Sequence, residues 1–258
     1  MTGLRIIILC GLLLFSTGGR GESWPPELQT TSFTIAIDGI QTTVHVPETY
    51  DPARPYPLVV AMHGLSDSPA EYLSWFNITQ FVDEKEFILI APAATRFTSW
   101  PRSDPVGAVE GITSAITRRY HVDTDRIYLT GADRGARAVF MVASAADHFA
   151  GLLTISGSGD APAAPVHLIH IHGERDLFYS WSEGRRTFRQ FQETMQCQGE
   201  SSFKNGEAGK SRYRFNESLA CSGGKSTVFY SIPGAATRPA LSQEFLSSLM
   251  DRLLRLRL

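Results

Sequence analysis

Alternating and continuous apolar segments follow one another along the chain and predict strands and helices in turn. Phe33–Ile37 alternates apolar and polar residues, Asp38 and Gly39 follow as a turn, and residues 41–46 alternate again. This pattern predicts a β-hairpin. Leu58–Met62 is apolar throughout, as expected of a parallel strand that is buried on both faces of a sheet.

Beyond this strand, the segments alternate between helical and extended patterns. Apolar residues at helical spacing, such as Val109, Ile112 and Ile116, predict helices, and short apolar runs predict strands. The expected helices are residues 70–82, 106–116, 136–146, 181–195 and 241–256, and the expected strands are 87–91, 126–130, 152–156, 166–171 and 227–232. Strands that alternate with helices predict a single-domain α/β fold, with a mostly parallel sheet covered by helices on both faces.

The N-terminus has the pattern of an export signal. Arg5 is followed by an apolar run from Ile6 to Phe15 and then by small residues. The run is shorter than the roughly 20 residues needed to span a bilayer. We therefore predict a signal peptide at 1–21, a mature domain at 22–258, secretion to the extracellular space, and no membrane association after signal removal. The alternative is an N-terminal membrane anchor.

Composition and cysteine usage agree with an exported globular protein. The 258 residues carry a net charge of -2 and are 43% hydrophobic, which suffices for one sizeable core and gives no reason to expect nucleic acid. Removal of the signal leaves Cys197 and Cys221, a pair that suggests one disulfide, with two free thiols as the alternative. Asn77 and Asn216 begin candidate glycosylation sequons.

The turn after the strand at 126–130 carries the most informative residue, Asp133. The segment Gly131–Gly135 has the frame of a G-x-S-x-G nucleophile elbow, in which a strained turn lifts a serine hydroxyl above a sheet. Aspartate stands where the serine belongs. In folds with this elbow a histidine follows late in the chain. The last of the 7 histidines is His172, so the expected base is missing as well.

Four segments together resemble the α/β-hydrolase superfamily, and within it the secreted feruloyl esterases and polyhydroxybutyrate depolymerases. They are PLVVAMHG at 57–64, FILIAP at 87–92, YHVDTDRIYLTG at 120–131 and HIHGERD at 170–176. The resemblance covers most of the mature chain and implies no cofactor. Residues 157–165, where this fold often inserts a lid, are too few for one, so we expect no lid domain and a shallow, open cleft.

The resemblance assigns a role to individual positions. Leu65 and Arg134 match the residues whose backbone N–H groups form the oxyanion hole. Asp176 matches the acid that orients the histidine, and Ala236 stands at the position of the histidine itself. Asp133 replaces the nucleophilic serine. Cysteines at the positions of Cys197 and Cys221 are common in these esterases.

Loss of both serine and histidine, with the frame retained, indicates a catalytically degenerate protein, a pseudoenzyme. Such a protein would bind a small-molecule ester, a polysaccharide or a protein ligand in the former cleft. The alternative is an active carboxylic-ester hydrolase that uses Asp133 as nucleophile or another residue as base. His167, His170 and His172 recur as in a metal site, but a strand that ends in a family-like His-Gly is the simpler interpretation, and no metal is expected.

Two carboxylates in a partly desolvated cleft would repel each other unless a cation joins them. Arg238 follows the vacated histidine position by two residues. We expect its guanidinium to bridge Asp133 or Asp176 through paired hydrogen bonds while being unable to act as a base. The alternative is that Arg238 points to solvent.

Overall fold

The computed structural model of the protein describes residues 24–25, 31–94, 100, 105–198 and 202–258. The predicted signal peptide at 1–21 lies outside the described residues. Within the described part of the chain, every helix is too short or too polar to cross a membrane.

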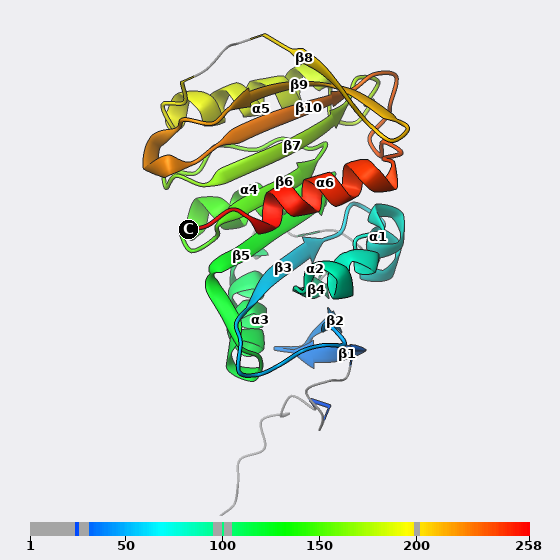
Figure 1. The fold of residues 1–258 in the computed structure, drawn as a ribbon, viewed down its shortest axis with the longest axis vertical. Coiled ribbons are helices and arrows are strands. Elements are labelled where there is room, and N and C mark those ends of the chain that lie inside the picture. The colour runs from blue at the N-terminus through cyan, green and yellow to red at the C-terminus, as the bar shows by residue number, and fades with distance from the viewer. Residues whose placement is uncertain (1–23, 26–30, 95–99, 101–104, 199–201) are drawn as a thin grey trace, which may run out of the picture.

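One ten-stranded sheet forms the centre of the molecule, in the order β1-β2-β4-β3-β5-β6-β7-β10-β9-β8 (Figure 1). The middle strands run parallel and are β4 (Ile88–Pro92), β3 (Tyr56–Met62), β5 (Val122–Ala132), β6 (Gly151–Ile155), β7 (His167–Gly173) and β10 (Thr227–Ile232). Antiparallel hairpins complete both edges: β1 (Ser32–Ile37) with β2 (Ile40–His45), and β8 (Lys204–Ala208) with β9 (Ser211–Ser218).

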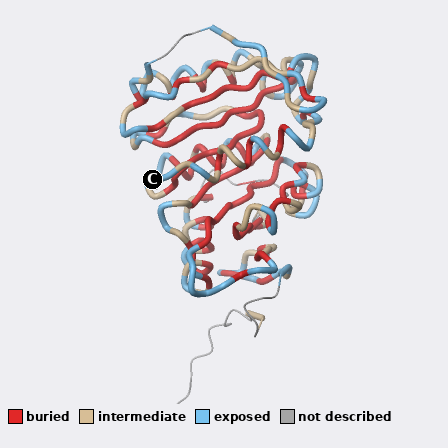
Figure 2. Tube along the Cα trace, in the orientation of Figure 1, coloured by how far each residue is buried: buried red, intermediate tan, exposed pale blue. Residues whose placement is uncertain are grey.

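Helices cover both faces of this sheet (Figure 1). One face packs against α3 (Pro105–Arg119), α4 (Arg134–Ala145) and α5 (Trp181–Thr194), and the other against α1 (Pro69–Phe76) and α6 (Gln243–Leu254). The middle strands are buried along their length, except at residues 123–126 near the start of β5 (Figure 2). The predicted fold class is therefore confirmed: a single α/β domain with a mostly parallel sheet between two helical layers.

The structure differs from the sequence-based expectations at two places. The helix expected over 70–82 is broken at Asn77, whose left-handed backbone (φ 53°) ends α1 before a 3-10 turn, Thr79–Phe81, and the short α2 (Val82–Lys85). The hairpin of β8 and β9 was not expected, because β8 has the polar sequence KNGEA. It lies at the exposed edge of the sheet, where packing does not demand apolar residues.

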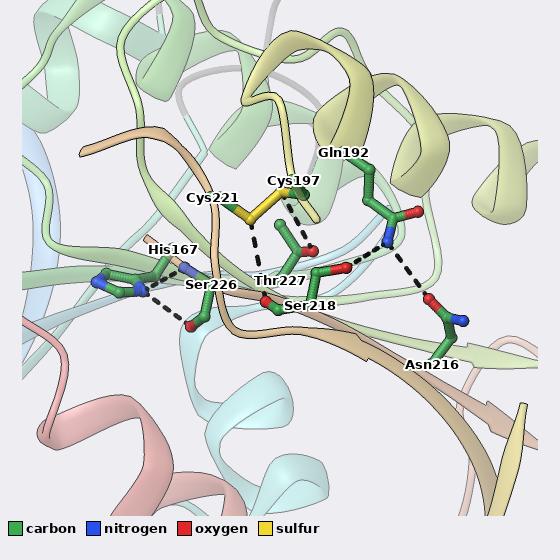
Figure 3. The surroundings of a disulfide bond; sticks show 8 residues. All are labelled: His167, Gln192, Cys197, Asn216, Ser218, Cys221, Ser226 and Thr227. Atoms are coloured by element: carbon green, nitrogen blue, oxygen red, sulfur yellow. Dashed lines mark hydrogen bonds between the residues drawn. A yellow bond between two sulfur atoms is a disulfide. The ribbon is translucent and has the colours of Figure 1, made fainter. Parts of the chain in front are cut away.

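The disulfide between Cys197 and Cys221 is confirmed and ties the end of α5 to the segment before β10 (Figure 3). Beside it, the Gln192 amide donates to the Ser218 hydroxyl at 2.9 Å. The sequon residue Asn216 is only 5% exposed, and its amide nitrogen donates to the Ser202 carbonyl at 2.9 Å. A glycan could reach it only before folding, whereas Asn77 is exposed and stays a candidate site.

Candidate functional site

Asp133 lies on the sharp turn between β5 and α4, at backbone angles of φ 55° and ψ -119°. Such angles are strained for any residue with a side chain. Two glycines allow the turn. A Cβ on Gly135 would lie 2.0 Å from the Met62 carbonyl oxygen, and one on Gly131 would lie 2.6 Å from the backbone of Gly135. The predicted elbow geometry is thus present, with a carboxylate at its tip.

The Asp133 carboxylate turns toward the loop after β3. The backbone N–H of Leu65 donates to its Oδ2 at 3.1 Å. Burial raises the pKa of Asp133, although this N–H and the charges of Arg134 and Arg238 oppose the rise. The Leu65 N–H is the donor that the resemblance assigns to the oxyanion hole, and the protein's own carboxylate occupies it.

Asp176 follows β7 and is enclosed by donors. Its Oδ1 accepts from the backbone N–H groups of Phe178 at 2.9 Å and Tyr179 at 3.0 Å, and from the Thr237 hydroxyl at 2.7 Å. Its Oδ2 has no hydrogen-bond partner among the described residues. Burial alone would raise the pKa of Asp176, but the donors, Tyr179 first, outweigh it and lower the pKa. Asp176 is therefore held as a carboxylate.

A cleft of about 670 Å³ joins these parts. Its described lining includes Asp133, Leu65, Arg134 and Ala236, together with Thr237, whose hydroxyl contacts Asp176. The structure thus brings the elbow, both residues of the matched oxyanion hole and the vacated histidine position to one site. Their catalytic or binding roles remain predictions.

Arg238 does not bridge Asp133 or Asp176, and that expectation was wrong. Its guanidinium forms an ion pair with Asp67 and lies 5.7 Å from the centre of the Trp75 ring. Asp67 comes from the loop after β3 and is only 7% exposed, so it needs a cation more than the half-buried Asp133 does. No sequence motif pointed to Asp67, because only the folded chain brings residues 67 and 238 together.

The three histidines nearest the site are locked in neutral hydrogen-bonded positions. His63 Nε2 accepts the Ala94 N–H at 2.9 Å, so its Nδ1 donates to the Gly64 carbonyl at 3.0 Å. His172 Nε2 lies 2.9 Å from the Tyr179 carbonyl, and its Nδ1 lies 3.2 Å from His170 Nε2. Burial lowers the pKa of all three. None of them is among the described residues that line the cleft.

The histidines of β7 have hydrogen-bond partners within the protein. His167 Nδ1 contacts the Ser226 hydroxyl at 3.0 Å, while His170 accepts from or donates to Thr154 at 2.8 Å. A search of the described residues finds no group of three or more His, Cys, Asp or Glu side chains that could hold a metal ion.

Comparison with known proteins relates this chain to esterases, although no family model matches it. It is 22% identical over 195 residues to the bifunctional acetylxylan esterase/xylanase XynS20E of Neocallimastix patriciarum, covering 72% of this chain and 29% of that protein. It is 23% identical over 211 residues to the probable feruloyl esterase C of Aspergillus terreus, covering 77% of each. Among solved structures, the acetyl xylan esterase of Aspergillus awamori superposes with a TM-score of 0.68 at 13% identity, over 86% of this chain and 98% of that one.

The protein therefore has the α/β-hydrolase fold, and acetylxylan and feruloyl esterases are among its relatives and structural neighbours. The chain spans less than a third of the length of the bifunctional relative and about three quarters of the feruloyl esterase.

Proposed function

We propose that this protein is a catalytically degenerate member of the esterase lineage, which binds a ligand in the cleft at Asp133 without hydrolysing it. The observation that supports this most is the contact between Asp133 Oδ2 and the Leu65 N–H. In an ester hydrolase that N–H must be ready for the negative charge that develops on the substrate oxygen. A resident carboxylate both engages the donor and repels such a charge.

The histidines support the same proposal. Ester hydrolysis by this fold needs a base that activates the nucleophile or the water. His63 and His172 already use both ring nitrogens in buried contacts, and Ala236 stands where the resemblance puts the base. The oxyanion-hole frame alone would leave on the order of 10³-fold acceleration over water.

The rim of the cleft favours a binding role. Phe178 lines the cleft and is 80% exposed, and its neighbour Leu177 is 92% exposed. Exposed apolar side chains beside a cleft commonly mark a binding surface. Because the relatives are named for acetylxylan and feruloyl esters, we expect the ligand to be a small ester or a polysaccharide rather than a nucleic acid.

Secretion is part of the proposal. The apolar N-terminal segment has the pattern of an export signal, and the disulfide would persist in an oxidising compartment. Expression in a secreting host should release a protein whose N-terminus lies near residue 22. Retention inside the host, or in its membranes with the N-terminal segment uncleaved, would contradict this part.

The test of the main proposal is an assay of the mature protein with p-nitrophenyl acetate and methyl ferulate, alongside a fluorophosphonate probe. We expect no probe labelling and a rate no more than about 10³-fold above the uncatalysed reaction. A kcat within the range of about 1–10³ s⁻¹ would overturn the proposal. If that activity disappears in Asp133→Asn, the alternative applies, an ester hydrolase with Asp133 as nucleophile.

A further inference from the structure

Three cavities follow one another away from Asp133, and each shares lining residues with the next. The cleft at Asp133 shares Arg134 and Tyr179 with a second cavity of about 200 Å³. The second shares Arg137 and Met141 with a third of about 660 Å³. Because positions 134, 137, 141 and 144 recur at helical spacing, the groove follows one face of α4, over roughly 15 Å. We call the second and third cavities together the arginine groove.

Guanidinium groups dominate the charge of the arginine groove. Arg134, Arg137 and Arg186 line it, and Asp160 is the only acidic residue among its described lining. Arg137 is exposed, and none of the ion pairs within the described residues involves it. Among the described residues, Arg186 forms an ion pair with Glu183 alone, at 3.9 Å, and both side chains are exposed. Exposed ion pairs of this kind are weak, so Arg186 can engage an added anion, as can the exposed Arg137.

The walls of the groove are fixed before any ligand arrives. The Gly159 N–H donates to the Thr187 hydroxyl at 3.3 Å, which ties the loop after β6 to α5. A Cβ on Gly159 would lie 2.5 Å from the Phe140 side chain, so this loop packs directly onto α4. Thr187 and Phe140 are both buried. A groove with such fixed walls loses little conformational freedom on binding.

We propose that the arginine groove binds a linear acidic polysaccharide, whose carboxylate groups pair with Arg137 and Arg186. A guanidinium fork matches a carboxylate in charge and shape. Ser144, Ser158 and Gln190 add hydroxyl and amide groups that suit the hydroxyl groups of a sugar. This inference rests on the proposed function, in which the adjoining cleft holds its ligand without cleaving it.

Calorimetric titration of the mature protein tests the ligand class. The probes are an oligomer of galacturonic acid, a neutral xylose oligomer of equal length and an oligoglutamate peptide of equal charge. We expect the uronic-acid oligomer to bind at least about tenfold more tightly than either control, since charge-assisted hydrogen bonds require both the carboxylates and the sugar geometry. Added salt should weaken this binding through screening. Equal binding of oligoglutamate, or of the neutral oligomer, would overturn the proposal.

Substitutions locate the binding. Arg137→Ala and Arg186→Ala should each raise the Kd for the uronic-acid oligomer roughly threefold to tenfold. Arg137→Lys should raise it less than Arg137→Ala does. Arg189→Ala is the matched control, because Arg189 is exposed on the same helix as Arg186 but does not line the groove. An equal loss in the Arg189 variant, or no binding by the wild type, would overturn the inference. Turnover of p-nitrophenyl acetate in the same samples separates the two proposals, because hydrolysis would refute the proposed function whatever the oligomer does.

Discussion

Asp133 and Asp176 follow the carboxyl ends of two strands of one sheet, β5 and β7. Their surroundings shift the pKa values of the two carboxyl groups in opposite directions. Asp176 receives two backbone N–H groups and one hydroxyl, and its pKa is lowered despite burial. The Asp133 carboxylate accepts a hydrogen bond from the backbone N–H of Leu65, and burial raises its pKa. The loop around Asp176 therefore stabilises the charged carboxylate, whereas burial at the elbow disfavours the charged form of Asp133.

This difference fits a site in which one half has been kept and the other altered. The loop of residues 174–179 is also pinned by the capping box that Ser180 and Glu183 form at the start of α5. The elbow keeps the backbone strain of a nucleophile turn but carries a side chain that engages the neighbouring N–H. Strain of this kind is commonly part of a catalytic mechanism. The strain at Asp133 therefore agrees with the proposal that this protein is a degenerate member of an esterase lineage.

The largest effect is expected from restoring the altered half. Asp133→Ser combined with Ala236→His should raise esterase activity by roughly 10²–10⁴-fold over the wild type, because triad members act as a unit and general-base catalysis contributes about that much. Asp176 still offers an acceptor oxygen, Oδ2, without a partner among the described residues, which a histidine N–H could use. Initial rates with p-nitrophenyl acetate measure the gain.

Each single substitution is the control for that experiment. Asp133→Ser alone frees the Leu65 N–H but lacks a base, and Ala236→His alone lacks a hydroxyl, so neither should gain more than about tenfold. A double variant that folds normally and still shows no gain would mean that the half around Asp176 has also lost its catalytic geometry.

The second-largest effect is expected on the free energy of unfolding when Asp176 is replaced. Asp176→Ala leaves two backbone N–H groups and the Thr237 hydroxyl without their acceptor, which should cost about 3–5 kcal/mol of unfolding free energy. Asp176→Asn keeps one acceptor oxygen and should cost less than half of that. Chemical denaturation measures both variants. Similar, small losses in the two would show that water replaces the carboxylate without difficulty.

Removal of the disulfide ranks third and acts far from both carboxylates. Cys197→Ser with Cys221→Ser should lower the unfolding free energy by about 3 kcal/mol, by the chain-entropy account of a cross-link that spans 24 positions. The pKa values of Asp133 and Asp176 should stay unchanged. If the double variant shifts either of them, the edge of the sheet is coupled to the distant hairpin, and the two carboxylates cannot be compared as local environments.

The sequence was sufficient to predict the fold class, a single α/β domain with a mostly parallel sheet. Continuous apolar runs such as Leu58–Met62 are typical of the middle strands of a parallel sheet, and the structure puts this run there. The β8–β9 hairpin could not be predicted in the same way. Its exposed edge strand satisfies its backbone hydrogen bonds without an apolar pattern, so composition carries no signal for it.

For the site, the backbone frame was predictable and the side-chain contacts were not. Close backbone approaches require glycine at positions 131 and 135, and these two glycines make the elbow recognisable in the sequence. The Arg238–Asp67 pair joins residues that are 171 positions apart, and the choice of Asp67 over Asp133 depends on which carboxylate is more buried. Local sequence contains no information on that choice.

The smallest effect is a pH dependence that separates the two carboxylates. The raised pKa of Asp133 means that its stabilising contribution is complete below the unfolded pKa of 3.8 and is lost as pH rises through the folded value. The lowered pKa of Asp176 has the opposite effect: its contribution to stability is present above pH 3.8 and is lost as pH falls through the folded pKa.

Asp133→Asn, which keeps an acceptor for the Leu65 N–H, should therefore gain stability relative to the wild type as pH increases. The gain should stay below about 1 kcal/mol near neutrality, since Asp133 is only half-buried and solvent screens its charge. Denaturation of both proteins from about pH 3 to about pH 7, with carboxyl NMR titration, measures it. A pKa for Asp133 at or below that of Asp176 would remove the contrast between the two halves of the site.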